Sequence, residues 1–215
     1  MDAVRFRLAK PSDARALANV HYSTRDKNDM GIFAQMRKGF ITTYYKIVLN
    51  EPNEVVLCAE KDGKIVGINS FTLDAEKQQK CLRRNSLRLG FSALGTIICK
   101  PQIIVQLFRR FISLKKNSES KFILSSGTRG EFWGWDPSES NPEMSIEMNE
   151  TAMLFARLLK CNTLPFEVDM ANRSIYKFHK INGAIEKKRI VLGDGRERVL
   201  MEYDLTNRKQ FKRMI

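Results

Sequence analysis

Two short glycine-containing turns constrain the fold of this chain more than any other feature. They are Lys61-Asp62-Gly63 near the middle and Gly193-Asp194-Gly195 near the end. Each turn separates two segments with strand-like composition: Val55–Glu60 and Lys64–Leu73, and Ala184–Leu192 and Glu197–Leu205. A tight turn between two such segments predicts a β-hairpin. The chain is therefore expected to contain antiparallel sheet in two places.

Strand and helix patterns alternate around these hairpins. Val4–Ala9 alternates apolar and basic residues like a half-buried strand, Phe122–Trp135 is typical of a long strand, and Phe166–Met170 of a short one. Four segments have the apolar spacing or the boundary residues of helices: a run after Pro11-Ser12-Asp13, Ile32–Leu49, Glu143–Lys160 and Asn172–Asn182. This order predicts an α/β (α+β) fold with a mixed, mostly antiparallel sheet of about seven strands, flanked by helices.

The segment Ala75–Lys116 departs from this alternation. It predicts two helices broken near Lys100-Pro101, because proline cannot continue a helix and disfavours helix at the residue before it. Each apolar run is shorter than the roughly 20 residues that a membrane-spanning helix needs. We expect one domain over residues 1–215, with a helical insertion at 75–116 and a basic C-terminal tail at 206–215.

Positive charge is concentrated in the same insertion. The chain has a formal net charge of +13, and between Lys77 and Lys116 it has ten Lys or Arg residues and no Asp or Glu. Such a segment attracts a phosphorylated cofactor, an acidic carrier protein, an anionic membrane surface or nucleic acid, or it is a solvated basic face. Nucleic acid is the weakest of these, since neither a helix-turn-helix nor a basic-region pattern accompanies the charge.

The chain start and the cysteines limit the remaining classes. Met1–Arg7 does not pair a basic head with an apolar run, so we expect no signal peptide and a cytoplasmic protein, with peripheral attachment at the inner membrane face left open. The four cysteines and two histidines lack metal-ligand spacing. We therefore expect reduced thiols and no metal site.

The segment Phe166–Ala184, FEVDMANRSIYKFHKINGA, resembles the last βα unit of the GNAT (N-acetyltransferase) superfamily. Asn172 and Gly183 match the family spacing, and His179 stands where the family commonly has a tyrosine. The opening Arg7–Asp13 also resembles the family's first strand and helix start. The resemblance covers nearly the whole chain except residues 75–116, and it implies an acyltransferase that uses acetyl-CoA or another acyl thioester.

The chain departs from that family in the loop that holds the cofactor phosphates. The family has a glycine-rich, basic loop there, whose backbone N–H groups bind the pyrophosphate of coenzyme A. Residues 136–147 of this chain contain no Gly, Lys or Arg, and Glu139, Glu143 and Glu147 are expected to repel phosphates. Either the phosphates lie elsewhere, for instance on the basic insertion, or the acyl group arrives on a carrier protein, or the site is degenerate.

His179 and Glu131 are the candidate catalytic residues. Acyl transfer to an amine needs a base for the amine proton, donors for the oxyanion and an acid for the departing thiolate. By its correspondence to the family tyrosine, His179 is the expected acid. Strand alternation places Glu131 on the same face as Trp133, which makes Glu131 the expected base.

The candidate cofactor-binding residues follow from the resemblance. They are Trp133, Gly134, Trp135, Ser138 and Asn172. In the family this strand offers its backbone to the pantetheine arm, and Gly134 is consistent with a close approach. The two tryptophans are alternatively core residues, and Asn172 is alternatively a helix cap.

The sequence therefore predicts transfer of an acetyl group from acetyl-CoA to an amine of a small molecule. An amino sugar in surface-polysaccharide assembly is the specific expectation. It rests on the resemblance to GNAT-like proteins with a long basic insertion and on aromatic residues near the expected acceptor side. Two alternatives remain: an enzyme that takes the acyl group from an acyl carrier protein docked on residues 77–116, and a non-catalytic GNAT-like binding module.

Overall fold

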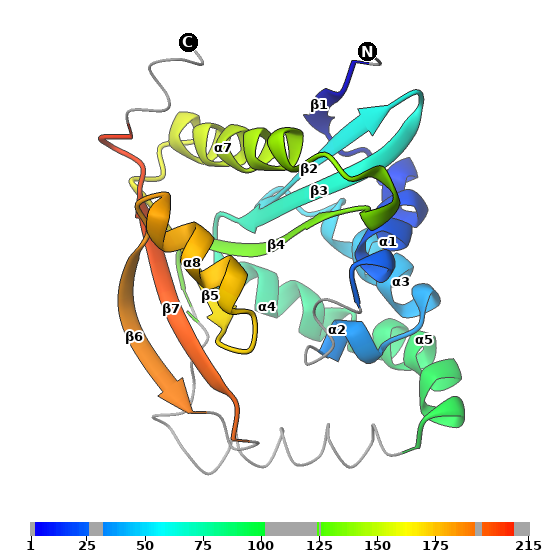
Figure 1. The fold of residues 1–215 in the computed structure, drawn as a ribbon. Helices are drawn as coiled ribbons and strands as arrows, with labels where there is room; N and C mark the ends of the chain where they lie inside the picture. Colours follow the sequence, from blue (N-terminus) through cyan, green and yellow to red (C-terminus); the bar gives the residue numbers. More distant parts are fainter. Residues whose placement is uncertain (1–2, 26–31, 102–123, 125, 192–194, 209–215) are drawn as a thin grey trace.

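The computed structural model describes residues 3–25, 32–101, 124, 126–191 and 195–208. These residues form seven strands, with helices on both sides of the sheets, as Figure 1 shows. The mixed α/β fold of mostly antiparallel strands predicted from the sequence is confirmed. The second predicted helix of the insertion, after Pro101, lies outside the described residues.

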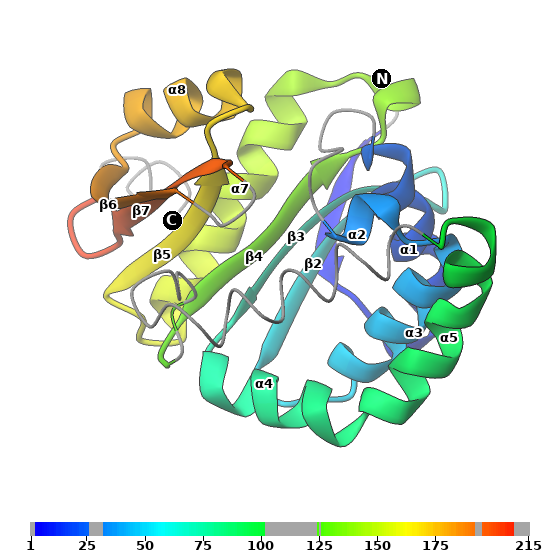
Figure 2. The ribbon, with the colours of Figure 1, turned by 90° about the horizontal axis from the view of Figure 1, so that it is seen from below.

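The strands form two hydrogen-bonded sheets. The first has the order β1-β2-β3-β4, and the second has the order β5-β7-β6. Their bounds are β1 (Arg5–Leu8), β2 (Glu54–Lys61), β3 (Lys64–Thr72), β4 (Arg129–Trp135), β5 (Thr163–Asp169), β6 (Ile185–Val191) and β7 (Glu197–Asp204). Every hydrogen-bonded pair is antiparallel. β4 and β5 lie side by side between the sheets without a hydrogen-bonded ladder, as Figure 2 shows.

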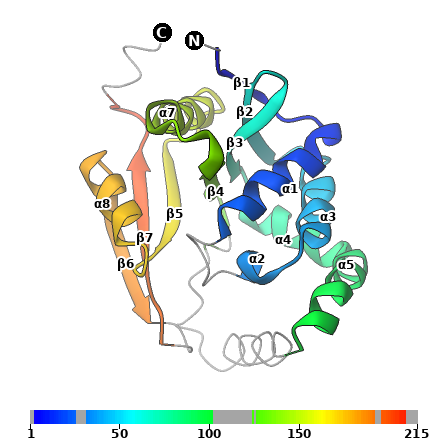
Figure 3. The ribbon, with the colours of Figure 1, turned by 45° about the vertical axis from the view of Figure 1, so that its right-hand side comes forward.

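Helices cover opposite faces of the first sheet (Figure 3). The face covered by α1 carries Val56, Cys58 and Ile68, whereas the face covered by α7 carries Ala59 and Val66. The helices are α1 (Ala14–Ser23), α2 (Ile32–Gln35), α3 (Lys38–Val48), α4 (Ala75–Arg84), α5 (Ser86–Cys99), α7 (Pro142–Leu158) and α8 (Arg173–Ile181). Each falls short, in length or in apolar content, of what a membrane crossing requires; the search extends only to the described part of the chain.

A third group of apolar residues joins the two sheets. Val55 and Phe71 of the first sheet belong to the same buried cluster as Val168 and Met201 of the second, and Met153 of α7 packs among them. The two halves of the chain thus share buried apolar contacts, which fixes β4 against β5 despite the missing ladder.

The predicted helix Ile32–Leu49 is two helices. Arg37 has extended backbone (φ −72°, ψ 158°) between α2 and α3, and its N–H donates to Thr96 Oγ1 of α5 at 3.1 Å. This hydrogen bond satisfies a backbone donor outside the helix, and its partner lies far away in the sequence. Local apolar spacing could not reveal the break.

The predicted strand Phe122–Trp135 is shorter than expected. Of its described residues, β4 begins only at Arg129. Gly127 has a φ of 75°, a left-handed conformation that does not continue a strand. The first predicted helix of the insertion is also divided: Asn85 separates α4 from α5.

The segment predicted as a basic tail begins with an anchored residue. Arg208 is 9% exposed and pairs with Glu150 of α7 at 2.6 Å. A second guanidinium nitrogen donates to the Asn182 carbonyl at 3.1 Å, and the guanidinium lies over the Tyr203 ring. Thr206–Arg208 therefore belongs to the folded domain, and residues 209–215 lie outside the described residues.

Replacing Arg208 tests this anchor. Arg208→Ala leaves Glu150 buried without its cation, so we expect the free energy of unfolding in urea to fall by about 3 kcal/mol. Arg189→Ala is the matched control, because Arg189 pairs with Glu186 and Glu197 at an exposed position, where solvent weakens ion pairs, and we expect a far smaller loss. Equal losses in the two variants would contradict the anchor.

Candidate functional site

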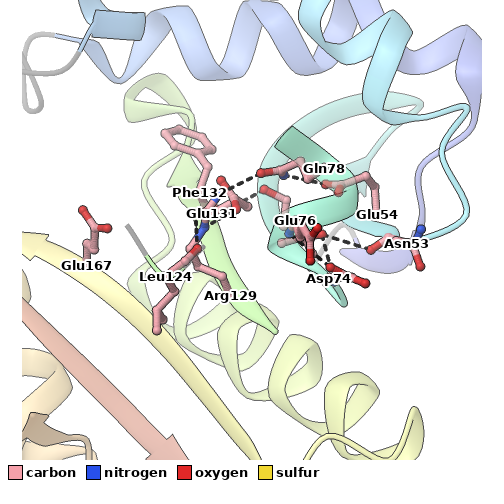
Figure 4. Close-up of polar contacts among 12 residues, drawn as sticks. Asn53, Glu54, Asp74, Glu76, Gln78, Leu124, Arg129, Glu131, Phe132 and Glu167 are labelled. Atoms are coloured by element: carbon pink, nitrogen blue, oxygen red, sulfur yellow. Dashed lines mark hydrogen bonds and ion pairs between the residues drawn. The ribbon is translucent and has the colours of Figure 1, made fainter. Parts of the chain in front are cut away.

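Three largely buried carboxylates surround Arg129 near the start of β4. Arg129 Nε donates to Glu131 Oε1 at 2.7 Å, and Nη2 donates to Gln78 Oε1 at 2.7 Å. Gln78 in turn donates to Glu54 Oε2 at 2.9 Å. Figure 4 shows this chain of contacts from β4 through α4 to β2, with Glu167 of β5 across from it. We call Glu54, Glu131 and Glu167 the carboxylate cluster.

Burial makes all three carboxylates weaker acids than usual. It raises the pKa of Glu54 to about 7 and the pKa of Glu167 to about 7, and it raises the pKa of Glu131 as well. Arg129 and Arg198 lower these values in part, and Arg198 pairs with Glu167 at 2.8 Å. Glu54 Oε1 is buried without a hydrogen-bond partner among the described residues. Where all three carboxyls are ionised, three negative charges against two guanidiniums leave the cluster able to attract a cation.

A β-bulge decides which face Glu131 occupies. Its neighbours Gly130 and Phe132 pair with consecutive residues of β3, so Glu131 is an extra residue in the β4 register. Glu131 lies with Arg129, whereas Trp133 packs against α8 and α7 on the other side of the sheet. The expectation that Glu131 and Trp133 share one face is wrong, because strict alternation fails at a bulge. The amino-sugar expectation placed aromatic residues near the acceptor side. Trp133 does not lie on the carboxylate side.

His179 lies on the Trp133 side, buried among aromatic rings. It is 7% exposed, and its Nδ1 shares a hydrogen bond of 2.7 Å with the Tyr203 hydroxyl. The rings of Trp133 and Phe166 lie 5.8 and 4.4 Å from the imidazole, centroid to centroid. Burial lowers the pKa of His179 to about 4, so the ring is uncharged at neutral pH. It can then donate or accept a hydrogen bond, but it does not store a proton as an imidazolium.

Two buried side-chain N–H donors near His179 lack an acceptor in good hydrogen-bond geometry within the described ranges. Asn69 of β3 is paired with Trp133 of β4, and its amide donates to Asn149 Oδ1 of α7 at 2.9 Å. Trp133 Nε1 and Asn149 Nδ2 are both buried and have no hydrogen-bond partner among the residues that the structure describes. The Asn149 amide also lies close enough to Tyr203 to lower the pKa of that hydroxyl in part, against burial, which raises it. Unpaired buried donors are costly, so this pair is suited to an acceptor atom of a ligand.

The acidic side chains of the 136–147 loop, which was predicted to lack a phosphate site, pair with lysines. Glu139 accepts hydrogen bonds from Lys61 at 3.2 Å and from Lys64 at 3.4 Å. Lys64 also pairs with Asp136 at 3.7 Å. The expected repulsion by Glu139 is therefore offset by two lysines of the β2–β3 hairpin, which the sequence did not associate with this loop. These lysines place positive charge beside the 136–147 loop.

Most of the other predicted cofactor-binding residues have structural partners. Asp136 Oδ1 accepts hydrogen bonds from both the N–H and the hydroxyl of Ser138. Trp135 Nε1 donates to the Glu139 carbonyl at 2.7 Å. Asn172 caps α8 by accepting from the Ile175 N–H at 3.3 Å. At Gly134 an added Cβ would meet the Phe132 ring at 2.8 Å, so its missing side chain makes room for a core ring.

Solved structures match this arrangement over nearly the full chain. An N-acetyltransferase from Staphylococcus aureus Mu50 matches 95% of this chain and 99% of its own, with a TM-score of 0.58 and 10% sequence identity. The fold is that of the GNAT acetyltransferases. An acetyltransferase from Salmonella typhimurium, solved with its cofactor acetyl-CoA, covers 97% of each chain at a TM-score of 0.55 and 11% identity. An N-acyl amino acid synthase from uncultured soil microbes covers 100% of this chain and 98% of its own, with a TM-score of 0.57 and 9% sequence identity. No protein-family model and no curated protein sequence matches.

The sequence did not single out several residues that the GNAT fold brings to this site. Asn149 and Glu150 are polar residues on the inward face of a helix whose neighbours Met148 and Ala152 are buried. Asn69 is a polar residue within the apolar strand β3. The signal that could have identified these residues was a polar side chain at a position expected to be buried, since buried polar groups need hydrogen-bond partners.

An open hollow of about 520 Å³ lies at the end of β4 nearest Arg129. It is lined by the residue after β3, by residues that precede β4, by the α7–β5 connection and by the start of β5: Leu73, Leu124, Ser126, Gly127, Thr128, Leu159, Lys160, Cys161, Asn162, Thr163 and Pro165. The Leu124 carbonyl accepts from Arg129 Nη1 at 3.0 Å, which connects the hollow to the carboxylate cluster. Within the described chain, no group of three or more His, Cys, Asp or Glu residues is placed to hold a metal ion.

Removing the Glu139 charge should strengthen phosphate binding in the loop. In Glu139→Gln, Lys61 and Lys64 lose the Glu139 carboxylate, so we expect coenzyme A to bind roughly five-fold more tightly in low-salt calorimetry. Glu143→Gln removes the same formal charge from the first turn of α7 and is the control. An equal gain in both variants would show that general charge, rather than the two lysines, is responsible.

Burial of Glu54 should make stability depend on pH. Its pKa rises from 4.5 to about 7 on folding, so the native state holds a proton that the unfolded chain releases. This contribution to stability is present below pH 4.5 and is lost as the pH rises toward about 7. Glu54→Gln should lack that decline, with a gain over the parent on the order of 1 to 3 kcal/mol at pH 8. Parallel urea-unfolding curves for the two proteins across pH would contradict the buried carboxyl.

Proposed function

We propose that this protein transfers an acyl group from a thioester to the amine of a small molecule. One observation carries the proposal: β4 has cation-attracting carboxylates on one face and unused N–H donors beside His179 on the other, among the described residues. The missing ladder between β4 and β5 leaves a place where a donor on one side and an acceptor on the other can meet. The GNAT fold supports the same reaction class, although fold alone does not define a substrate.

The donor thioester lies on the His179 face in this proposal. Trp133 Nε1 and Asn149 Nδ2 donate to the thioester carbonyl oxygen, which becomes an oxyanion as the amine attacks. His179 hydrogen-bonds the departing sulfur as a neutral ring. The backbone of β4 at Gly134 and Trp135, together with Ser138 and Asn172, would flank the rest of the donor, as the family resemblance implies.

The acceptor amine lies on the carboxylate face. An ammonium group is attracted by the cluster and must lose a proton before its nitrogen can attack. Glu131 takes this proton, and burial, which raises its pKa, makes it a stronger base than an ordinary carboxylate. The nitrogen then bonds to the carbonyl carbon and gives up its second proton to water. The C–S bond breaks, and the thiolate leaves and takes a proton from water.

Two kinds of donor are compatible with this site. Acetyl-CoA is the simplest, and it is the cofactor with which the Salmonella acetyltransferase was solved. An acyl group on a carrier protein is the second candidate. Glu139 and Asp136 already pair with Lys61 and Lys64 beside the 136–147 loop, so these lysines are less available to the phosphates of coenzyme A. The likeness to an N-acyl amino acid synthase supports transfer of an acyl group to an amine. For the acceptor we propose an amine such as an amino sugar, which the cluster would hold through its ammonium group.

A panel of donors and acceptors tests the function. Acetyl-CoA, a long-chain acyl-CoA and a charged acyl carrier protein are each mixed with amino sugars and amino acids, and thiol release and product mass are measured. We expect an N-acylated product with one donor class. Thiol release with no acylated amine would indicate thioester hydrolysis and contradict acyl transfer to an amine. No turnover of any donor would favour the non-catalytic binding module.

Variants on the His179 face locate the chemistry. With the active donor, we expect Asn149→Leu and His179→Phe each to lower kcat by about 10²-fold while changing donor binding less, because both act mainly on the transition state. Asn50→Leu, at an exposed position after α3, is the control and should stay within about two-fold. Unchanged kcat in folded Asn149→Leu and His179→Phe would return both residues to a structural role.

A further inference from the structure

The outer face of α5 carries an exposed apolar line. Leu87, Phe91, Leu94 and Ile98 are spaced four, three and four residues apart, so they project from one side of the helix. Their exposed fractions are 78%, 71%, 47% and 77%. Single exposed apolar residues are ordinary, but four in a line on one helix mark an interaction surface. We call these four residues the α5 line.

Contacts on the opposite side fix the orientation of α5. Ala93 and Thr96 are buried, and Thr96 Oγ1 accepts from the Arg37 N–H at 3.1 Å. Arg37 also donates to the Gly95 carbonyl at 3.3 Å. The helix therefore cannot roll to bury its outer line without breaking these contacts. The α5 line is a fixed feature of the folded chain.

Basic residues flank this line. Arg83 and Arg88 are exposed and form no ion pair among the described residues, and Lys80 and Arg84 lie on the same α4–α5 unit. Acidic residues are absent from the sequence between Lys77 and Lys116. Apolar side chains on one face of a helix with arginines beside them suit an interface that is apolar inside and anionic at its rim.

We propose that α5 is an interfacial helix that lies on an anionic lipid surface. Its 14 residues are too few to cross a bilayer, so it would lie in the plane of the headgroups with the α5 line inserted. All four side chains of the α5 line are exposed on one side of the helix, with arginines nearby, which suits insertion into an anionic lipid surface. The proposal stands on α5 and the end of α4 and is independent of the acyltransferase function.

Vesicle binding by the full chain tests the proposal. We expect co-sedimentation with phosphatidylcholine vesicles that contain about a quarter phosphatidylglycerol, weakened by high salt and much weaker with phosphatidylcholine alone. Phe91→Ser with Ile98→Ser should reduce binding at least ten-fold, and Arg83→Gln and Arg88→Gln about five-fold each. Ile181→Ser is the apolar control, since Ile181 is 84% exposed on α8, and Lys188→Gln is the basic control. Both controls should bind like the parent.

A fluorescence measurement distinguishes insertion of α5 into lipid from a loss of binding caused by misfolding. In separate variants, Phe91→Trp should be quenched by brominated lipid, whereas Ile181→Trp should not, because only α5 inserts. No binding at low salt, binding that ignores lipid charge, or equal loss in the α5 variants and the controls would overturn the proposal. So would tight binding of an acidic carrier protein through the same residues without any vesicle binding.

Discussion

The missing hydrogen bonds between β4 and β5 are the constraint on which the site depends. Antiparallel ladders fix both sheets, but the two strands that meet between them share only side-chain packing. Gly130 permits this approach, since an added Cβ would lie 3.1 Å from Phe166 Cβ. The bulge at Glu131 then turns a carboxylate toward Arg129 while Trp133 points to α8. One irregular strand thereby borders two chemical environments, which in the proposed reaction meet where β4 and β5 share no hydrogen bonds.

The two environments are opposite in character, and both differ from the surface of the protein. The chain is strongly basic overall, yet the α4 side of β4 gathers Glu54, Glu131 and Glu167, whose pKa values are raised by burial. The other side holds an uncharged imidazole among aromatic rings. A low-dielectric site strengthens every hydrogen bond made inside it, which is useful where charge develops on a carbonyl oxygen.

The sequence was sufficient for the fold and insufficient for the site. Glycine turns defined the hairpins, and the spacing Asn172–His179–Gly183 placed α8 correctly, because these signals are local. The bulge at Glu131 depends on the register with β3, and the break at Arg37 depends on Thr96. Likewise, the sequence could not show that the acidic charges of the 136–147 loop are offset by Lys61 and Lys64, which lie beside it in the fold. Long-range partners decided each of these features.

The most direct test of the account is a crystal structure with a stable ketone analogue of an acyl-pantetheine thioester. The account predicts its carbonyl oxygen within hydrogen-bond distance of Trp133 Nε1 and Asn149 Nδ2, with the atom that replaces sulfur nearest His179. It also predicts that the carboxylate cluster stays open on the far side of β4. An analogue bound among Glu54, Glu131 and Glu167, or one that leaves both donors bonded only to water, would contradict the account.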